Sequence, residues 1–597
     1  MACAWLGQGR NSPAGWRMQS RRGRCVRNRM SRGPGRGCVL AKAMRRAVER
    51  PMLVLTPILA LQTLPTLWAK EVWFPDEPRH AAAFMQMMEN GHWLVLHVGQ
   101  IPYPDKPPLY FWMLAGLSWL FDSRDPALFQ FAAALSALFF LTATVHAARA
   151  FCLPRSVPLL AGLVLLTDHF FIERAHFPRM DLLFCTFILL SHVFFYRAAT
   201  GPRDLTPRAA MLAFAMAGLA TLTKGPIGIL LPLAGLVLFL ARERRLAALL
   251  DRGYGAGLAV YAAMMATYLA GVVAVEGLGF LHAILVEQTL ARALDTWIAA
   301  EPFYFYLRRL PEFWLPWTVL LFFLPWRRLG ESAFWRTLWG APQKSGEHKG
   351  RAYLWITALG SLAIISSFDY KVRFLVLTFY PQTAMLIALF LAELPRSRRV
   401  AVFSVVLGFL AVLVTALPAL PQALPWPERI KGEWMIFATG LVALALLVML
   451  RRRPPIIFVG SLATGLALVF LPYYLLTIRG LNDTMSPRVQ GEIMGRHADA
   501  GYALYYYDPP FSEGMFDYYA GRAVPNIWGT KALAAAVAGK SCGVVAMRDR
   551  YWRSWDNRPE GMELIDERIL DRRTIMLLRW RRGADGEKPC TVPAAAS

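Results

Sequence analysis

Ionisable side chains are concentrated in one stretch of the chain, residues 71–108, which follows the first strongly apolar segment. The stretch contains the pair Asp76-Glu77 and, further along, the sequence DKPP at 105–108. A carboxylate placed here could take a proton from an incoming hydroxyl, a role that accelerates reactions by roughly 10²–10⁴-fold. Lys106 could face a phosphate, because an ammonium acts as a point charge for that group. The structural alternative is a solvated loop whose acids cap one helix and whose prolines begin the next.

Four further clusters of charge follow along the chain. They are ERAHFPRMD (173–181), TLTKGP (221–226), EQTLARALD (287–295) and FDYKVR (368–373). Arginine at a membrane boundary commonly anchors a helix to the lipid headgroups, but the carboxylate of Asp181 gains nothing from anionic lipid. Lys224 and Arg292 add positive charge that could face a phosphate. Together the clusters suit a site that combines carboxylates with several cations.

The bulk composition indicates a polytopic α-helical membrane protein. The 597 residues are 56% hydrophobic with a mean hydropathy of +0.36, and the chain contains long uncharged runs. The sequence KPPLYFWMLAGLSWLF at 106–121 predicts a helix that lies in the membrane interface. About thirteen membrane-spanning helices are predicted by apolar windows at 52–69, 126–148, 157–172, 181–196, 209–222, 226–241, 255–275, 313–326, 352–366, 374–392, 400–418, 434–450 and 455–478.

Positive charge in the connecting loops predicts the orientation. With a cytoplasmic N-terminus, the inner loops contain RAFCLPR, RERRLAALLDR, PRSRR and RRR, as the positive-inside rule requires. The outer face then holds residues 70–125, 168–180, 276–312 and the chain from about 480. The charged clusters fall on this face, whereas an ion-coupled transporter would hold ionisable groups near the bilayer midplane. No HxxxH or HxH spacing among the outer histidines indicates a metal site.

The N-terminal region differs from the apolar middle of the chain. Residues 1–50 contain thirteen Lys and Arg but a single acid, Glu49. We expect a disordered cytoplasmic tail there, with nucleic-acid binding as the weaker alternative. The composition also fits upstream sequence translated from an early start, with Met30, Met44 or Met52 as the true beginning.

The C-terminal region changes to short alternating segments. YALYYYD, SCGVVAM and RTIMLLRW predict strands, and KALAAAVAGK predicts a helix. A stretch of about 115 residues suffices for a small α/β domain, and an odd number of spans places it outside the membrane. Cys542 and Cys590 share this region, so one disulfide there is left open. The predicted organisation is a tail at 1–50, a membrane domain at 51–480 with an outer loop at 70–125, and an extracytoplasmic α/β domain at 481–597.

Four of these motifs carry a family resemblance. FPDEPRHAAA, YPDKPPLYFW, PRMD and LTKGP occur in this order at residues 74–226. In order and spacing they resemble the bacterial branch of the integral-membrane GT-C glycosyltransferases, a group that includes the aminoarabinose transferase acting on lipid A and the protein O-mannosyltransferases. The resemblance covers roughly residues 52–330, and an exported α/β domain after thirteen spans is similar to the aminoarabinose transferase branch.

The resemblance implies roles for individual residues. Asp76, Asp181 and Glu77 are the expected catalytic acids. Tyr103, Lys106, Lys224 and Arg292 are expected to contact a carrier phosphate, and Asp105 occupies a position associated with a divalent cation. The chain departs from the family pattern in two places, since Asp105 stands where Glu is usual and Phe374 where a tyrosine is expected.

The resemblance also implies a reaction. A sugar, 4-amino-4-deoxy-L-arabinose or another monosaccharide, would pass from a polyprenyl phosphate, expected to be undecaprenyl phosphate, to lipid A or a related envelope acceptor. The reaction would invert the anomeric carbon at the periplasmic face of a bacterial inner membrane. One alternative is a protein O-mannosyltransferase-like enzyme acting on Ser or Thr, and another, from a different class, is a flippase or transporter of the lipid-linked sugar.

Overall fold

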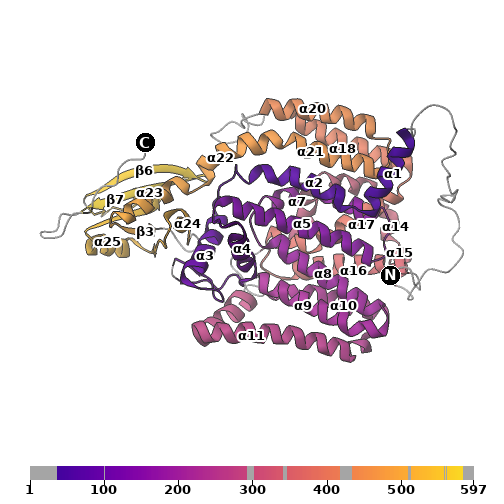
Figure 1. Cartoon of the computed structure of the whole chain (residues 1–597), viewed down its shortest axis with the longest axis horizontal. Helices are drawn as coiled ribbons and strands as arrows, with labels where there is room; N and C mark the ends of the chain where they lie inside the picture. The colour runs from indigo at the N-terminus through magenta and orange to yellow at the C-terminus, as the bar shows by residue number, and fades with distance from the viewer. Residues whose placement is uncertain are drawn as a thin grey trace.

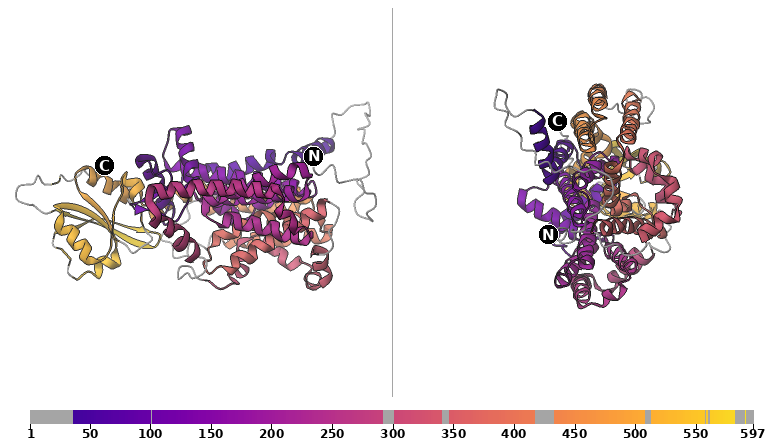
Figure 2. Two further views of the ribbon diagram at one scale, coloured as in Figure 1. Left: turned by 90° about the horizontal axis from the view of Figure 1, so that it is seen from below. Right: turned by 90° about the vertical axis from the view of Figure 1, so that its right-hand side faces the viewer.

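The computed structural model describes residues 36–99, 101–291, 301–339, 346–416, 433–507, 513–556, 558–559, 561–581 and 590. Most of these residues are helical, and the helices run side by side along the long axis of the molecule (Figure 1). A β-sheet lies at one end of this bundle and α1 (Arg36–Glu49) at the other, as further views also show (Figure 2). The protein is therefore an elongated helical body that carries a sheet at one end.

The bundle is built from helices in both halves of the chain. In the first half they are α2 (Met52–Thr63), η1 (Leu64–Thr66), α5 (Pro126–Ala150), α6 (Val157–Leu165), α7 (His169–Ala175), α8 (Asp181–Thr200), α9 (Thr206–Lys224), α10 (Ile227–Arg242) and α11 (Arg252–His282). In the second half they are α13 (Phe305–Phe313), η5 (Trp317–Phe323), α14 (Trp326–Gly330), α15 (Ser332–Trp339), α16 (Gly346–Ser367), η6 (Arg373–Phe379), α17 (Tyr380–Glu393), α18 (Arg396–Ala416), α20 (Glu433–Leu450), α21 (Pro455–Val469) and α22 (Ile478–Met485).

Six segments within the described part of the chain are long and apolar enough to cross a membrane. They are Pro126–Ala150, Asp181–Thr200, Arg252–Glu287, Arg373–Glu393, Arg396–Ala416 and Pro455–Met485. Shorter apolar helices accompany them. The chain is therefore a multi-pass membrane protein, as predicted, while the total of thirteen spans stays a prediction.

One predicted apolar window is divided into two helices. Within residues 157–172, α6 ends at Leu165 and α7 begins at His169. The break occurs at Asp168, whose Oδ1 accepts a hydrogen bond from the amide of Phe171 at 2.9 Å. An aspartate that caps a new helix satisfies an amide that no helical carbonyl can reach. Apolar composition alone did not reveal this break.

Residues 70–125, predicted to face outward, lie at the sheet end of the bundle (Figure 1). Their elements are α3 (Glu77–Asn90), the paired strands β1 (His97–Val98) and β2 (Ile101–Pro102), and α4 (Leu109–Phe121). Both helices expected from this stretch are present. Asp76 occupies the N-cap position of α3, but its side chain makes no capping hydrogen bond. Its carboxylate is therefore directed to other partners.

A five-stranded sheet is present where the C-terminal strands were predicted. Its strands are β3 (Ala503–Tyr507), β4 (Asn526–Ile527), β5 (Cys542–Arg548), β6 (Met562–Leu570) and β7 (Arg573–Arg581), in the order β4-β3-β5-β7-β6. The pairs β3–β4 and β3–β5 are parallel, and the pairs β5–β7 and β6–β7 are antiparallel. The accompanying helices are α23 (Arg488–Asp499), α24 (Asp517–Ala520), α25 (Thr530–Gly539) and α26 (Asp549–Arg553). A disulfide joins Cys542 to Cys590, the pairing that the sequence left open.

The central strand β5 is buried on both faces of the sheet. On one face Val544 packs in a cluster with Met494 of α23, and on the other Val545 packs with Leu533 of α25. Phe74, two residues before Asp76, belongs to the first of these clusters. The segment that leads to the candidate acids is thus part of the hydrophobic core of the sheet.

A buried carboxyl group lies where α3 contacts α24. Gln86 on α3 donates its Nε2 to Oδ2 of Asp517 at 3.3 Å, and the amide of Val524 donates to Oδ1 at 3.2 Å. Burial raises the pKa of Asp517 to about 7, although these hydrogen bonds act in the opposite direction. The contact between α3 and the sheet region therefore favours the protonated acid.

We expect the Asp517→Asn variant to lose a pH dependence of stability. The carboxyl pKa is about 3.9 in an unfolded chain and about 7 in the folded protein. The stabilisation is therefore full below about pH 4 and is lost as the pH rises to 7. The melting temperature of the detergent-purified protein should fall between pH 5 and pH 8, and should fall less in Asp517→Asn. The control is Asp499→Asn, whose side chain is 69% exposed; equal slopes in the two variants would contradict the assignment.

A close approach of backbones predicts a second effect on stability. A Cβ atom added to Gly350 of α16 would overlap the carbonyl oxygen of Phe151, at the end of α5. Because that oxygen belongs to the backbone, Gly350→Ala should separate α16 from α5 and reduce the melting temperature and the membrane abundance. A Cβ on Gly408 of α18 would meet no atom within 4 Å, so Gly408→Ala should be neutral or slightly stabilising. An unchanged melting temperature for Gly350→Ala would refute this packing.

Candidate active site

A chain of four charged groups runs between the loop after η1 and the membrane helices. Nη1 of Arg179 donates to Oδ2 of Asp76 at 2.8 Å, and Nε of Arg179 lies 3.3 Å from Oδ2 of Asp181. The ammonium of Lys224 donates to Oδ1 of Asp181. The Asp181 side chain is 3% exposed, whereas that of Asp76 is 36% exposed. Asp76 is therefore the carboxylate that a substrate can reach, and Asp181 lies behind it.

The ends of two helices explain how Asp181 and Lys224 meet. Asp181 is the first residue of α8 and Lys224 is the last residue of α9, and these two helices pack against each other. An acid at a helix N-terminus and a base at a C-terminus are each stabilised by the helix dipole. Gly225, with φ 98°, and Pro226 then end α9. The Asp181–Lys224 pair is therefore built by ordinary helix termination signals.

The charge on Asp76 is stabilised by its neighbours. Burial opposes ionisation of this carboxyl, but the positive charges of Arg179, Arg79 and Lys106 lower the pKa of Asp76. Burial and the charge of Arg179 lower the pKa of His80 to about 3, so that imidazole is neutral at physiological pH. Asp76 is consequently held as an ionised carboxylate that accepts a hydrogen bond from Arg179.

Glu77 is enclosed rather than accessible. Lys70 donates its Nζ to Oε1 and Oε2 of Glu77 at 2.5 and 2.7 Å, and the amide of Trp73 donates to Oε2 at 2.8 Å. The side chains of Lys70 and Glu77 are 4% and 1% exposed. Burial raises the pKa of Glu77 and lowers the pKa of Lys70. The predicted catalytic role of Glu77 is untested, and its contacts favour a structural role in holding the loop.

The predicted phosphate-binding residues of the outer loop adjoin Asp76. Tyr103 is hydrogen-bonded to Arg79, and Lys106 is among the charges that act on Asp76. Nζ of Lys106 also donates to the carbonyl oxygen of Asp105 at 3.2 Å. Burial, together with the charge of Asp105, raises the pKa of the Tyr103 hydroxyl well above its usual value. The DEP and DKPP motifs therefore form one cluster.

Two predicted assignments stay predictions. Arg292 lies outside the described residues. Asp105 was expected at a cation site, but within the described ranges no group of three or more His, Cys, Asp or Glu side chains is placed to hold a metal ion. The motif-based prediction of a cation at Asp105 is therefore supported by no ligand set in this structure.

Phe374, which stands where the family pattern has a tyrosine, lies close to three cations. The guanidinium carbons of Arg179 and Arg174 lie 4.0 and 4.8 Å from the centroid of the Phe374 ring, and the Lys224 ammonium lies 5.9 Å away. Each such contact is worth about 0.5–2 kcal/mol. In the described chain Nε and Nη1 of Arg174 are buried without a hydrogen-bond partner. Arg174 and Phe374 are thus functional candidates that the motifs did not identify.

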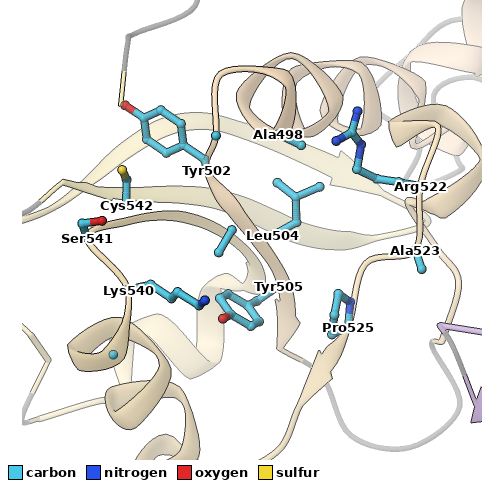
Figure 3. A pocket seen from close by; sticks show the side chains of 13 residues that line it. Ala498, Tyr502, Leu504, Tyr505, Arg522, Ala523, Pro525, Lys540, Ser541 and Cys542 are labelled. Atoms are coloured by element: carbon cyan, nitrogen blue, oxygen red, sulfur yellow. The ribbon is translucent and has the colours of Figure 1, made fainter. Parts of the chain in front are cut away.

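A hollow of about 640 Å³ is found in the sheet region, away from the charged cluster (Figure 3). It lies at the amino ends of β3 and β5, where Tyr505, Arg522 and Lys540 line it. None of the residues predicted to act in catalysis or phosphate binding lines this hollow.

Known proteins provide an independent comparison. Residues 105–270 match the family model described as dolichyl-phosphate-mannose-protein mannosyltransferase. An undecaprenyl phosphate-alpha-4-amino-4-deoxy-L-arabinose arabinosyl transferase of Pectobacterium carotovorum is 26% identical over 422 residues, which cover 68% of this chain and 70% of that protein. An uncharacterized protein of Aquifex aeolicus is 29% identical over 277 residues, 46% of this chain and 54% of that protein. The match spans about half the length of several curated relatives, including 49% of the arabinosyl transferase of Erwinia tasmaniensis.

The fold is similar to a solved structure. The crystal structure of ArnT from Cupriavidus metallidurans bound to undecaprenyl phosphate superposes with a TM-score of 0.71, covering 89% of this chain and 98% of that chain at 17% identity. The chain therefore shares the fold of that structure. The resemblance predicted from the motifs, to a GT-C glycosyltransferase of the aminoarabinose transferase type, is confirmed by the family match, the relatives and this fold together.

The buried pair of Asp181 and Lys224 predicts a specific pattern of stability. Asp181→Asn should destabilise the protein by about 3–5 kcal/mol, because it leaves a buried ammonium without its counter-charge. Adding Lys224→Met should recover much of this loss. Thermal unfolding of the single and double variants in the same detergent measures both effects. A double variant less stable than Asp181→Asn would show that the two charges do not compensate each other.

Proposed function

We propose that the protein transfers a sugar from a polyprenyl-phosphate carrier to an acceptor in the cell envelope. The observation that carries this proposal is the accessible carboxylate of Asp76, held by Arg179 beside a group of cations at the sheet end of the bundle. A carboxylate base can take the proton of a hydroxyl nucleophile, and cations stabilise a phosphate leaving group. The relatives named for undecaprenyl phosphate-alpha-4-amino-4-deoxy-L-arabinose support the nature of the donor.

In the proposed reaction Asp76 accepts the proton of the acceptor hydroxyl. The acceptor oxygen attacks the anomeric carbon opposite the phosphate, the bond from that carbon to the phosphate oxygen breaks, and the carrier phosphate departs with the electron pair. Attack from the opposite face inverts the anomeric carbon. Asp181, shielded behind Arg179, orients this guanidinium, and the guanidinium in turn positions Asp76.

Lysines and arginines stabilise the departing phosphate. Lys106 adjoins Asp76, and Arg174 brings two buried N–H groups without partners among the described residues. Lys224 is held by Asp181, and Tyr103 by Arg79.

A phosphate monoester dianion needs little protonation as a leaving group, so fixed positive charge is sufficient. Arg292 keeps its assignment from the motif, and a divalent cation at Asp105 is not required by this route.

The acceptor is proposed to be lipid A, and the site is proposed to face the periplasm of a bacterial inner membrane. The resemblance of the four motifs to the aminoarabinose transferase acting on lipid A supports the first proposal, and the names of the relatives are consistent with it for the donor. The disulfide between Cys542 and Cys590 supports the second, because such bonds persist in oxidising compartments. The sheet and α1 lie at opposite ends of the bundle, which supports an odd number of spans, thirteen in this proposal, and an extracytoplasmic α/β domain at 481–597 (Figure 1).

One alternative acceptor has support of its own. The family model that matches residues 105–270 is described as a protein mannosyltransferase. A Ser or Thr hydroxyl would be deprotonated by Asp76 in the same way, so the two acceptors share one mechanism. Glycolipid and peptide acceptors offered to the same preparation distinguish them.

Asp76→Asn tests the proposed base. Loss of the carboxylate should reduce transfer by roughly 10²–10⁴-fold without lowering the amount of protein in the membrane. The assay incubates purified protein with a radiolabelled polyprenyl phosphosugar and lipid A, and follows label in the acceptor. The matched control on the same helix is Glu89→Gln, since Glu89 is 40% exposed and makes only a surface ion pair with Arg124. Full activity of Asp76→Asn would refute the assignment, and a protein that moves the donor without forming a glycosidic bond would be a flippase.

A further inference from the structure

The segment that leads to Asp76 has no regular secondary structure of its own. Residues 70–73 lie between η1 and α3 and belong to no helix, strand or turn. Buried or half-buried backbone amides must find hydrogen-bond partners. The partners of this segment therefore determine where Asp76 is held.

Four consecutive amides of this segment have identified acceptors. The amide of Trp73 donates to Glu77 at 2.8 Å, within the loop itself. The other three donate to residues more than 400 positions later: Glu71 to Oδ1 of Asn482 at 3.2 Å, Val72 to the hydroxyl of Tyr519 at 3.0 Å, and Phe74 to the carbonyl oxygen of Met485 at 2.8 Å. The loop is thus held mainly by the C-terminal part of the chain.

Asn482 makes the largest share of these contacts. Its Oδ1 also accepts the indole N–H of Trp73 at 2.8 Å, and its Nδ2 donates to the carbonyl oxygen of Ala69 at 2.9 Å. The Asn482 amide therefore makes three hydrogen bonds to the loop. Two are to its backbone, at Glu71 and Ala69, and one is to the side chain of Trp73. An aspartate would retain the acceptor oxygens but lose the donor to Ala69, and a leucine would lose all three bonds.

Asn482 belongs to α22, which forms the C-terminal end of the apolar segment Pro455–Met485 and leads into the sheet region (Figure 1). Arg488, just beyond this helix, pairs with Glu71 at 3.0 Å, and the guanidinium of Arg573 on β7 lies 4.9 Å from the centroid of the Phe74 ring. These contacts hold the loop on both sides of Val72. The loop is consequently bound to the sheet region by contacts along its length.

We propose that Asn482 is a positioning residue, which holds residues 69–74 so that the carboxylate of Asp76 meets Arg179 and the acceptor hydroxyl. This proposal rests on the proposed function, in which Asp76 is the base. A displacement of about 1 Å at a reacting group can cost roughly 100-fold in rate. Asn482 touches no reacting atom, so its contribution passes through the loop.

The kinetic test compares two leucine variants on one helix. Asn482→Leu should reduce kcat for sugar transfer by roughly 10–100-fold, with the KM for the donor within a few-fold of the wild-type value. Asn482→Asp should lie between this variant and the wild type. The control, Asp483→Leu, changes the neighbouring exposed residue and should leave kcat unchanged. A merely structural role would lower the amount of folded protein but not the kcat per folded molecule, and a wild-type kcat for Asn482→Leu would overturn the proposal.

The hydrogen bonds from Asn482 to residues 69–73 are called the clamp. Hydrogen exchange tests this clamp without reference to activity. Peptides covering residues 69–76 should exchange faster in Asn482→Leu than in the wild type or in Asp483→Leu. Trp73→Phe removes the indole donor, so adding it to Asn482→Leu should cost less than the sum of the two single changes in kcat. Unchanged exchange in Asn482→Leu would refute the clamp. Faster exchange in a protein whose wild type transfers no sugar would instead refute the proposed function and leave the clamp intact.

Discussion

The arginine shared by two carboxylates is the interaction on which the site depends. Arg179 joins Asp76, which a substrate can reach, to Asp181, which is buried at the start of α8. Charges at a membrane boundary are costly unless they are paired. Pairing through one guanidinium satisfies that requirement and leaves one carboxylate accessible. Lys224 and the Phe374 ring complete the group, so that positive charge accumulates beside Asp76 without neutralising it.

Much of this organisation could be predicted from the sequence, because its signals are local. Apolar windows located the membrane helices, alternating segments located β3, β5 and β7, and helix termination signals lie at Asp181 and Lys224. Strand β6 (Met562–Leu570) was missed because it carries four charged residues in nine and lies at the edge of the sheet. The window at 313–326 likewise contains only the 3-10 segment η5, since Pro316 and Pro325 flank it.

The parts that could not be predicted are contacts between distant residues. Phe374 lies close to three cations from distant parts of the chain, and the residues next to Phe374 do not predict these contacts. Asn482 lies in a short polar helix where an asparagine would ordinarily be read as a surface residue. Glu77, by contrast, shares the motif of Asp76 but faces Lys70 and the loop backbone. Adjacent residues of one motif therefore differ in role because the chain turns between them.

The distance in sequence between the loop and its clamp has a consequence for biosynthesis. Glu71 and Asn482 are 411 positions apart, so at about 5–20 residues per second the ribosome adds the asparagine roughly 20–80 s after the glutamate. During that interval the amides of Glu71, Val72 and Phe74 lack their final acceptors. A nascent chain with most of its helices already synthesised therefore has an unfinished carboxylate loop, and the loop is completed only after residues 482–519 have been added.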